Sequence, residues 1–336
     1  MRFTCSADPG IFAILDIFET EASLESLHPG QAKTRPAFGE HEGNMVENYR
    51  GQRHSHPDGI AGTLPPIQSS MLEVEFAQIS DTGPIRPNNE DYVGYVLPEM
   101  PGQARTHGWL FALADGVGGH AQGEVASQVA VESVLAGFRG ASREEPLSAL
   151  LQRLVRLANA RIFEVALAAG KEGAGMATTI VSCALRHDRA VVAHVGDSRC
   201  YLTRQGEIRL LTRDHTVANE HARLGLLSEQ EAEETSSRHV LNRSLGTDLS
   251  VNVEINDYQV IPGDVLLLCS DGLHGALSAN QIAHAIVHGP DLEATAQTLV
   301  KFANEQDGAD NVSAQLIRVR SVERVGMYRG RPYKLR

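Results

Sequence analysis

Short turns between apolar runs constrain the fold of this chain most, because a connection of only a few residues joins strands that run antiparallel. Arg186-His187-Asp188 and Arg204-Gln205-Gly206 are such turns, and each lies between two apolar runs of strand length. The same criteria predict strands at residues 72–79, 91–97, 109–114, 177–185, 189–195, 199–203, 207–211, 251–259, 264–270 and 312–320. We therefore expect mainly antiparallel sheets.

Helical periodicity forms two groups around these strands, at residues 123–138 and 146–169 and again at 278–288 and 291–306. This order predicts an α+β domain in which sheet packs on sheet and the helices lie outside. A polar, acidic stretch at 215–236 is predicted to be a mobile, mostly helical insertion.

The first 70 residues differ from the rest, since Pro, Gly, Ser, His and Glu dominate and no apolar period persists. Such a composition predicts a disordered or loosely attached segment. We expect a folded domain at 71–320 and a basic tail at 321–336 that is either solvated or a docking peptide. Met71 opens the strand pattern and is an alternative start for the chain.

Composition excludes some classes of protein. The 336 residues carry a formal net charge of −12, which argues against a general nucleic-acid binder. The four cysteines have no paired spacing, as in proteins of a reducing compartment. No apolar run approaches the roughly 20 residues of a membrane span, and the patch at 11–15 is a poor signal peptide. We expect a cytoplasmic protein.

Acidic residues recur where the predicted strands end, next to glycine, asparagine, serine or another acid. They are Glu90-Asp91, Asp115-Gly116, Asp197-Ser198, Asp271-Gly272 and Asp310-Asn311. Carboxylates at the ends of core strands, beside small residues that let a backbone carbonyl approach, suit Mg²⁺ or Mn²⁺. One such acid means little, but five together suggest a shared metal centre.

Two other motifs have weaker support. Residues 116–121 match the glycine pattern of dinucleotide sites, but that reading needs a βαβ unit with an acid about 20 residues on. The nearest candidate, Glu132, lies inside a predicted helix. Cys183 and Arg189 have the spacing of cysteine-based phosphatases, yet no glycine lies between them and Cys183 falls within a predicted strand. We assign none of the 14 histidines to a zinc site, and only His120, beside the glycines, merits attention.

The motifs are more specific as an ordered set than one by one. In this order the chain contains R-x-x-N-E-D (86–91), D-G-x-G-G (115–119), G-M-x-T-T (175–179), G-D-S-R (196–199), S-D-G-L (270–273) and D-N-V-S (310–313). From about 71 to 320 it resembles the metal-dependent Ser/Thr protein phosphatases (PPM, protein phosphatase 2C), especially the bacterial branch.

The resemblance implies an α-β-β-α sandwich with two Mn²⁺ or Mg²⁺ ions between the sheets. The resemblance implies that the metal ligands are the Gly116 carbonyl and the carboxylates of Asp91, Asp115, Asp271 and Asp310. It places Asp197 at a third and weaker metal site. Glu90 would hold metal-bound water, and Arg86 would bind the substrate phosphate. Residues 215–236 would form a flap over the site. Animal enzymes often carry His after Asp-Gly, but this chain has Val117, so no protein group is assigned as general acid.

The function that the resemblance implies is hydrolysis of phosphoserine and phosphothreonine in proteins, in opposition to a Ser/Thr kinase. The alternative is a phosphatase-like module that binds phosphoproteins without turnover, although the intact acids weigh against it. A nicotinamide oxidoreductase is a more distant alternative. The sequence leaves the oligomeric state open.

Overall fold

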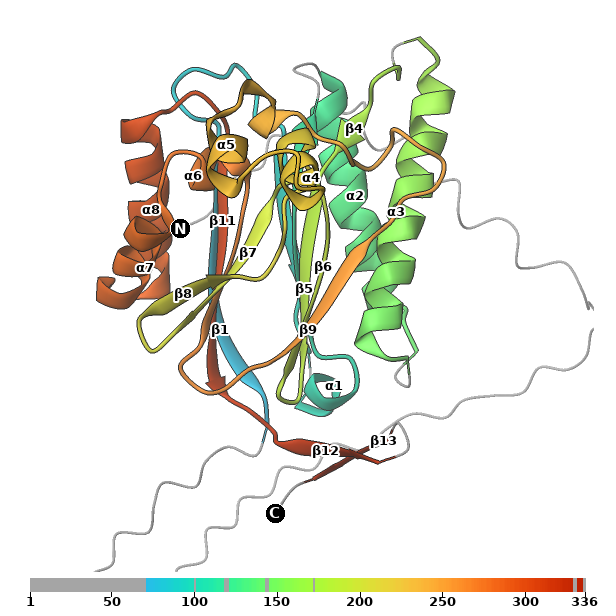
Figure 1. Cartoon of the computed structure of the whole chain (residues 1–336). Helices are drawn as coiled ribbons and strands as arrows, with labels where there is room; N and C mark the ends of the chain where they lie inside the picture. Colours follow the sequence, from blue (N-terminus) through green and yellow to red (C-terminus); the bar gives the residue numbers. More distant parts are fainter. Residues whose placement is uncertain are drawn as a thin grey trace, which may run out of the picture. The chain divides into compact units, whose positions relative to one another are not determined.

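The computed structural model describes residues 71–99, 101–117, 121–142, 145–171, 173–328 and 331–334. The segment 1–70, predicted to be disordered or loosely attached, lies outside these residues, as do the glycines at 118 and 119 and His120. Two antiparallel sheets pack face to face, with helices on both outer faces (Figure 1). The predicted four-layer α-β-β-α sandwich is therefore confirmed.

The first sheet has the spatial order β1-β11-β10-β7-β8. Its strands are β1 (Glu73–Asp81), β7 (Arg199–Arg204), β8 (Glu207–Leu210), β10 (Val265–Cys269) and β11 (Val312–Ser321). The second sheet has the order β2-β3-β5-β6-β9, and the short β4 pairs with the end of β3. Its strands are β2 (Asp91–Val96), β3 (Trp109–Val117), β4 (Ala177–Thr178), β5 (Ile180–Arg186), β6 (Arg189–Val195) and β9 (Glu254–Gln259).

The alternation of apolar residues along the central strands creates the layers. In β3, Leu110 and Ala112 face one core cluster and Phe111 and Leu113 face another. The first cluster lies beneath α2 (Ala121–Arg139) and α3 (Leu147–Ala169), and the second lies between the sheets. Because successive side chains of a strand point to opposite faces, a strand buried on both faces reads as one continuous apolar run.

The other outer layer consists of three helices over the first sheet. They are α6 (Asp271–His274), α7 (Ala279–His288) and α8 (Leu292–Gln306). Ser278 and Gln281 form a capping box at the start of α7. A separate short helix, α1 (Pro101–Thr106), precedes β3. No helix in the described part of the chain is long and apolar enough to cross a membrane.

Several boundaries differ from the sequence-based prediction. The run predicted as one strand at 177–185 is two strands, because Asp115 N bonds the hydroxyl of Thr179, although Thr179 N still donates to the Asp115 carbonyl (2.8 Å). The insertion at 215–236 is helical as predicted, with α4 (Val217–Arg223), α5 (Glu229–Glu234) and the 3₁₀ helix η2 (Ser236–His239). The predicted tail contains a hairpin of β12 (Val325–Tyr328) and β13 (Arg331–Lys334), for which the sequence offered no period-2 pattern strong enough to predict strands.

Candidate metal centre and active site

Asp91 and Asp115 face each other across neighbouring strands. Asp91 opens β2 and is paired in register with Asp115 near the end of β3. Counting from Phe111 and Leu113, the alternation of β3 directs Asp115 to the face between the two sheets. Directly opposite residues share a face, so both carboxylates lie at the open end of the inter-sheet layer.

Asp271 and Asp310 come from the other sheet, where β10 and β11 are neighbours. Asp271 is the first residue of α6 and lies two residues after the end of β10, and Asp310 lies two residues before the start of β11. Ser270 links the two sheets, since its hydroxyl donates to Asp91 Oδ2 (2.8 Å) and accepts from Ser313 N (3.0 Å). The structure therefore brings together four of the predicted acids from segments far apart in the sequence.

Asn311 fixes the loop that precedes β2, a role that the sequence did not reveal. Its Oδ1 accepts from Glu90 N (2.8 Å), and its Nδ2 donates to the carbonyls of Thr82 (2.8 Å) and Asn88 (2.9 Å). The signal was its place after Asp310 in the motif, but spacing alone does not show where an amide side chain points. Asn311 ties Glu90 and Asp91 to the strand end that carries Asp310.

Glu90 and Gly116 lie against Gly123 at the start of α2. A Cβ on Gly116 would overlap the backbone of Gly123, and a Cβ on Gly123 would overlap the carboxylate of Glu90. Gly116 N donates to the Glu90 carbonyl (3.0 Å). The close backbone approach explains why glycine is required at both positions, and it places the Gly116 carbonyl and Glu90 beside the acids.

Asp197 occupies the turn between β6 and β7. His274 Nε2 donates to the Asp197 carbonyl (3.0 Å), since a carbonyl oxygen can only accept, and burial lowers the pKa of His274 to about 3, so the ring is neutral. Ser198 shares a hydrogen bond with Thr179 (2.7 Å), whose hydroxyl oxygen also accepts from Asp115 N (3.0 Å). The third-site candidate is thus connected to the central acids through Thr179.

Arg86 forms an ion pair within the site. Its Nη2 lies 2.8 Å from Asp310 Oδ2, and its Nε donates to the Ala309 carbonyl (3.2 Å). The side chains of Arg86 and Asp310 are 40% and 37% exposed, so the guanidinium can still be reached from solvent. Arg86 therefore lies beside the acids, with Asp310 as its acidic partner.

Burial and mutual repulsion shift the acids toward their neutral forms. Burial, opposed by the nearby hydroxyls of Ser313 and Ser270 and reinforced by Asp271 and Asp310, raises the pKa of Asp91 to about 7. Burial and the neighbouring acids also raise the pKa of Asp115 and of Asp271, and they raise that of Asp197 to about 8. Such a cluster of buried carboxylates is costly unless a cation neutralises it.

The hydrogen bonding of Asp91 indicates whether these oxygen ligands suit a metal ion. Its Oδ2 accepts from Ser270, but its Oδ1 is fully buried and has no hydrogen-bond partner. A buried, unpaired carboxylate oxygen among three other acids is what an oxygen-preferring divalent ion would satisfy. The residues therefore fit Mn²⁺ or Mg²⁺.

A second cluster contains His194, His215 and Glu254, with potential ligand atoms within 4.8 Å of one another. His215 Nδ1 accepts from Gly196 N (3.2 Å), so its Nε2 carries the proton and faces Glu254 Oε2 (3.3 Å). A metal-binding histidine normally donates from its second nitrogen, and Arg243 Nη1 lies 3.4 Å from Nε2. These contacts favour a structural role for the cluster, which supports the turn of Asp197.

The two alternative motifs fail structurally. Cys183 is fully buried in β5, and burial raises the pKa of its thiol to about 12, so it cannot act as a nucleophile at neutral pH. Arg189 instead pairs with Asp257 (2.9 Å). The dinucleotide reading needs parallel strands on either side of a helix, whereas β3 and β5 are antiparallel neighbours.

Comparison with known proteins agrees with this geometry. The family model described as Protein phosphatase 2C matches residues 88–318. The chain belongs to the protein phosphatase 2C family. Protein phosphatase PhpP of Streptococcus pneumoniae is 31% identical over 248 residues, covering 73% of this chain and 97% of PhpP. A Listeria innocua protein named Serine/threonine phosphatase stp is 32% identical over 265 residues, covering 77% of this chain and 99% of that protein.

Solved structures of bacterial phosphatases share the fold. The Mycobacterium tuberculosis serine/threonine phosphatase PstP/Ppp has 32% sequence identity and a TM-score of 0.66, covering 74% of this chain and 100% of that one. The catalytic domain of PstP, solved in complex with two manganese ions, has 33% identity and a TM-score of 0.61 over the same shares. This member of the protein phosphatase 2C family is therefore a Ser/Thr protein phosphatase that uses Mn²⁺ or Mg²⁺.

Proposed function

We propose that this phosphatase hydrolyses phosphoserine and phosphothreonine in proteins at the cluster of Asp91, Asp115, Asp271 and Asp310. These carboxylates, with the Gly116 carbonyl, would hold two divalent ions. The observation that carries the assignment is the buried, unpaired Asp91 Oδ1 within a group of mutually repelling acids. When bound, two such ions lower the pKa of water and offset the charge of a transferring phosphoryl group.

Other side chains around that centre would have separate roles. Glu90 is fixed through its backbone by Asn311 and would orient the attacking water with its carboxylate. Arg86 is half-exposed at the rim and would donate to the phosphate oxygens in the bidentate manner of a guanidinium. Val117 follows Gly116 in β3 and offers no proton, so we assign no protein general acid. Asp197 would hold a third, weaker ion.

The biological setting follows from the reaction. Its substrates are products of Ser/Thr protein kinases, so we propose that the enzyme reverses the action of such a kinase. Cys183, Cys200 and Cys269 are free and buried, which supports a reducing compartment and, within it, the cytoplasm. We further propose that residues 71–320 form the catalytic domain and that the helical segment 215–236 is its flap.

The test is phosphate release from a phosphothreonine peptide with and without Mn²⁺, for wild type and for Asp310→Asn. Asp310→Asn should lower kcat by orders of magnitude, because it removes charge from the cation site with little change in volume. Asp307→Asn is the matched control, since Asp307 is exposed at the end of α8, only three residues away. Equal activity of the two variants would refute the assigned site.

A further inference from the structure

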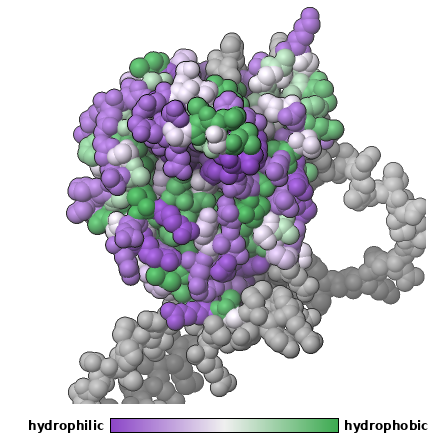
Figure 2. All heavy atoms as spheres, viewed as in Figure 1, coloured by the Kyte–Doolittle hydropathy of each residue, from purple (hydrophilic) through white to green (hydrophobic). Residues whose placement is uncertain are grey.

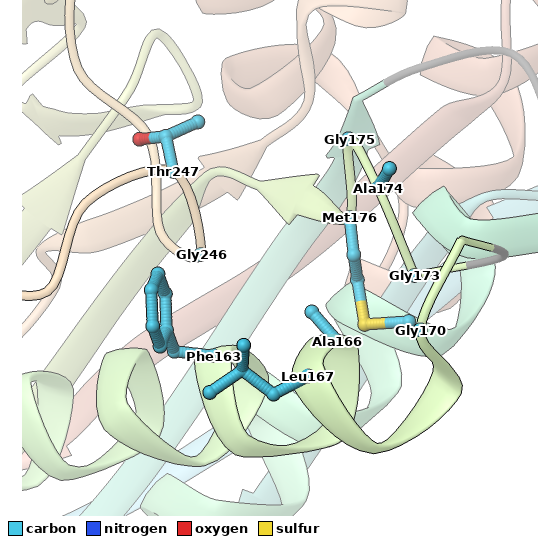
Figure 3. A pocket seen from close by; sticks show the side chains of 10 residues that line it. All are labelled: Phe163, Ala166, Leu167, Gly170, Gly173, Ala174, Gly175, Met176, Gly246 and Thr247. Atoms are coloured by element: carbon cyan, nitrogen blue, oxygen red, sulfur yellow. The ribbon is translucent and has the colours of Figure 1, made fainter.

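An apolar pocket lies between the C-terminal end of α3 and the loop that leads to β4. Its volume is about 420 Å³, within the range of ligand pockets. Figure 3 shows Phe163 and Leu167 rising from α3 on one side, Met176 opposite, and the backbone of Gly246 and Thr247 closing the far side. We call this site the α3 pocket.

The α3 pocket is connected to the catalytic centre through β4. Thr178 pairs in register with Gly116, the candidate carbonyl ligand, and Ala177 pairs with Val117. Met176, which lines the pocket, is two residues from Thr178, or about 7 Å along an extended chain. Figure 1 places β4 and the C-terminal end of α3 at the same end of the sandwich as α6, which carries Asp271.

The uncharged residues that line the α3 pocket favour an apolar ligand. None of the ten lining residues carries a charged side chain, and the one side-chain hydroxyl belongs to Thr247. A charged group would therefore lose its hydration without gaining a partner. Leu167 at the rim is 68% exposed, and Figure 2 shows hydrophobic surface over the upper part of α3. Exposed apolar surface around a pocket is typical of a binding site.

The far wall is held in place by hydrogen bonds. Asn159 of α3 accepts from Gly246 N (2.9 Å) and donates to the Asp248 carbonyl (2.9 Å). Gly246 has a φ of +89°, and a Cβ there would lie 2.5 Å from the Met176 carbonyl oxygen. The loop is thus already ordered, so binding of a side chain in the pocket would not cost the entropy of ordering it.

We infer that the α3 pocket binds an apolar side chain of the phosphoprotein substrate, about two to four residues from the phosphorylated residue. The inference rests on the proposed function, because the substrate chain must already lie over the acids. Met176 is two residues from Thr178, which pairs with Gly116, so a substrate segment lying over that end of the sheet would span the distance within that number of residues at about 3.3 Å per residue. The pocket would then select among phosphorylated sequences that the catalytic centre alone cannot distinguish.

The experiment measures kcat/KM for phosphothreonine peptides in which a single leucine is moved through each position near the phosphothreonine in an otherwise alanine-rich sequence. We expect leucine at one or two positions to raise kcat/KM about 5- to 30-fold, as partial burial of its side chain predicts. Ala166→Phe, which fills the pocket from α3, should abolish that preference while hydrolysis of p-nitrophenyl phosphate is unchanged. Ala168→Phe is the matched control, because Ala168 is exposed on the same helix and does not line the pocket.

Leu167→Glu is a second variant for the case in which Ala166→Phe does not fold. The Leu167 side chain is largely exposed, so a charge there should repel an apolar residue without disturbing the core. No positional preference for leucine in the wild type, or a preference that both pocket variants retain, would overturn the inference while leaving the proposed function intact. Failure of wild type to hydrolyse any peptide with Mn²⁺ would instead reject the proposed function, and the inference with it.

Discussion

Replacing Asp91 with asparagine should stabilise the metal-free protein while it weakens metal binding. The Asp91 carboxylate is buried, close to Asp271 and Asp310, and has one oxygen without a partner. Asparagine has nearly the same shape and can still accept from Ser270 through its oxygen. Its NH₂ group would replace the unpaired oxygen with a donor directed toward neighbouring acids.

The size of the effect follows from the pKa of Asp91, which burial raises from 3.8 to about 7. This rise in pKa means that the folded protein disfavours the ionised Asp91 carboxylate by about 4 kcal/mol. The asparagine amide also loses hydration when it is buried, which offsets part of this energy, so we expect Asp91→Asn to stabilise the metal-free protein by about 2–4 kcal/mol above pH 7. Because the folded pKa is raised, this carboxylate makes wild type progressively less stable from about pH 4 to pH 7, and the advantage of asparagine should be lost near pH 4, where the carboxyl group is protonated.

The assay is urea unfolding of both proteins at pH 5 and pH 8, first with a chelator and then with Mn²⁺. With chelator, Asp91→Asn should unfold at higher urea than wild type, and more so at pH 8. With Mn²⁺ at about 100 times its Kd, wild type should gain about 2.7 kcal/mol per site while the variant gains much less. A variant that is less stable than wild type at pH 8 in chelator would refute the view that this carboxylate destabilises the metal-free fold.

Four further outcomes are expected. Arg86→Ala should reduce kcat/KM roughly 10- to 150-fold, as loss of a charge-assisted bidentate contact predicts, and Arg86→Lys should recover only part of that loss. An unchanged kcat/KM at saturating Mn²⁺ would show that Arg86 does not bind the phosphate and only forms its ion pair with Asp310. Cys183→Ala should retain most activity below its melting temperature, and loss of turnover in the folded variant would restore the thiol mechanism. Mn²⁺ should restore activity to chelated enzyme better than Ca²⁺, whose larger and more flexible shell fits a compact site poorly; equal restoration would contradict this. Asn311→Ala should lower kcat and Mn²⁺ affinity together by releasing the loop of Glu90 and Asp91, and a change in thermal stability alone would show that the amide is only structural.

The layers of the fold were predictable because two physical signals agree along most of the chain. Short turns force antiparallel pairing, and strands such as β3 and β10, buried on both faces, read as uninterrupted apolar runs. The prediction of one continuous strand was wrong at Thr179, where one of the two expected backbone hydrogen bonds to Asp115 is replaced. There the threonine hydroxyl binds Asp115 N, a tertiary contact that local propensity does not encode.

The site was predictable at the level of its charged residues and less so at the level of their supports. Acids beside small residues at strand ends are visible in the sequence, and Asp91, Asp115, Asp271 and Asp310 meet as expected. Nothing in the spacing shows that Ser270 bridges the sheets or that His215 supports the turn of Asp197. Those roles depend on the direction of one hydrogen bond across long sequence separations, which only the packed structure determines.

The energetics of the acid cluster also weigh against the alternative of a module that binds phosphoproteins without turnover. Such a module would need a cationic surface for the phosphate, whereas this site buries several carboxylates whose pKa values are raised by desolvation and mutual repulsion. In the absence of a cation, acids that stay protonated would offer a phosphate dianion no positive charge and acids that ionise would repel it, and Arg86 is already paired with Asp310. Only cations at the cluster reverse both effects at once, since they neutralise the acids and attract the phosphate. A site that can bind its ligand only when it also holds the ions that activate water is a catalytic site.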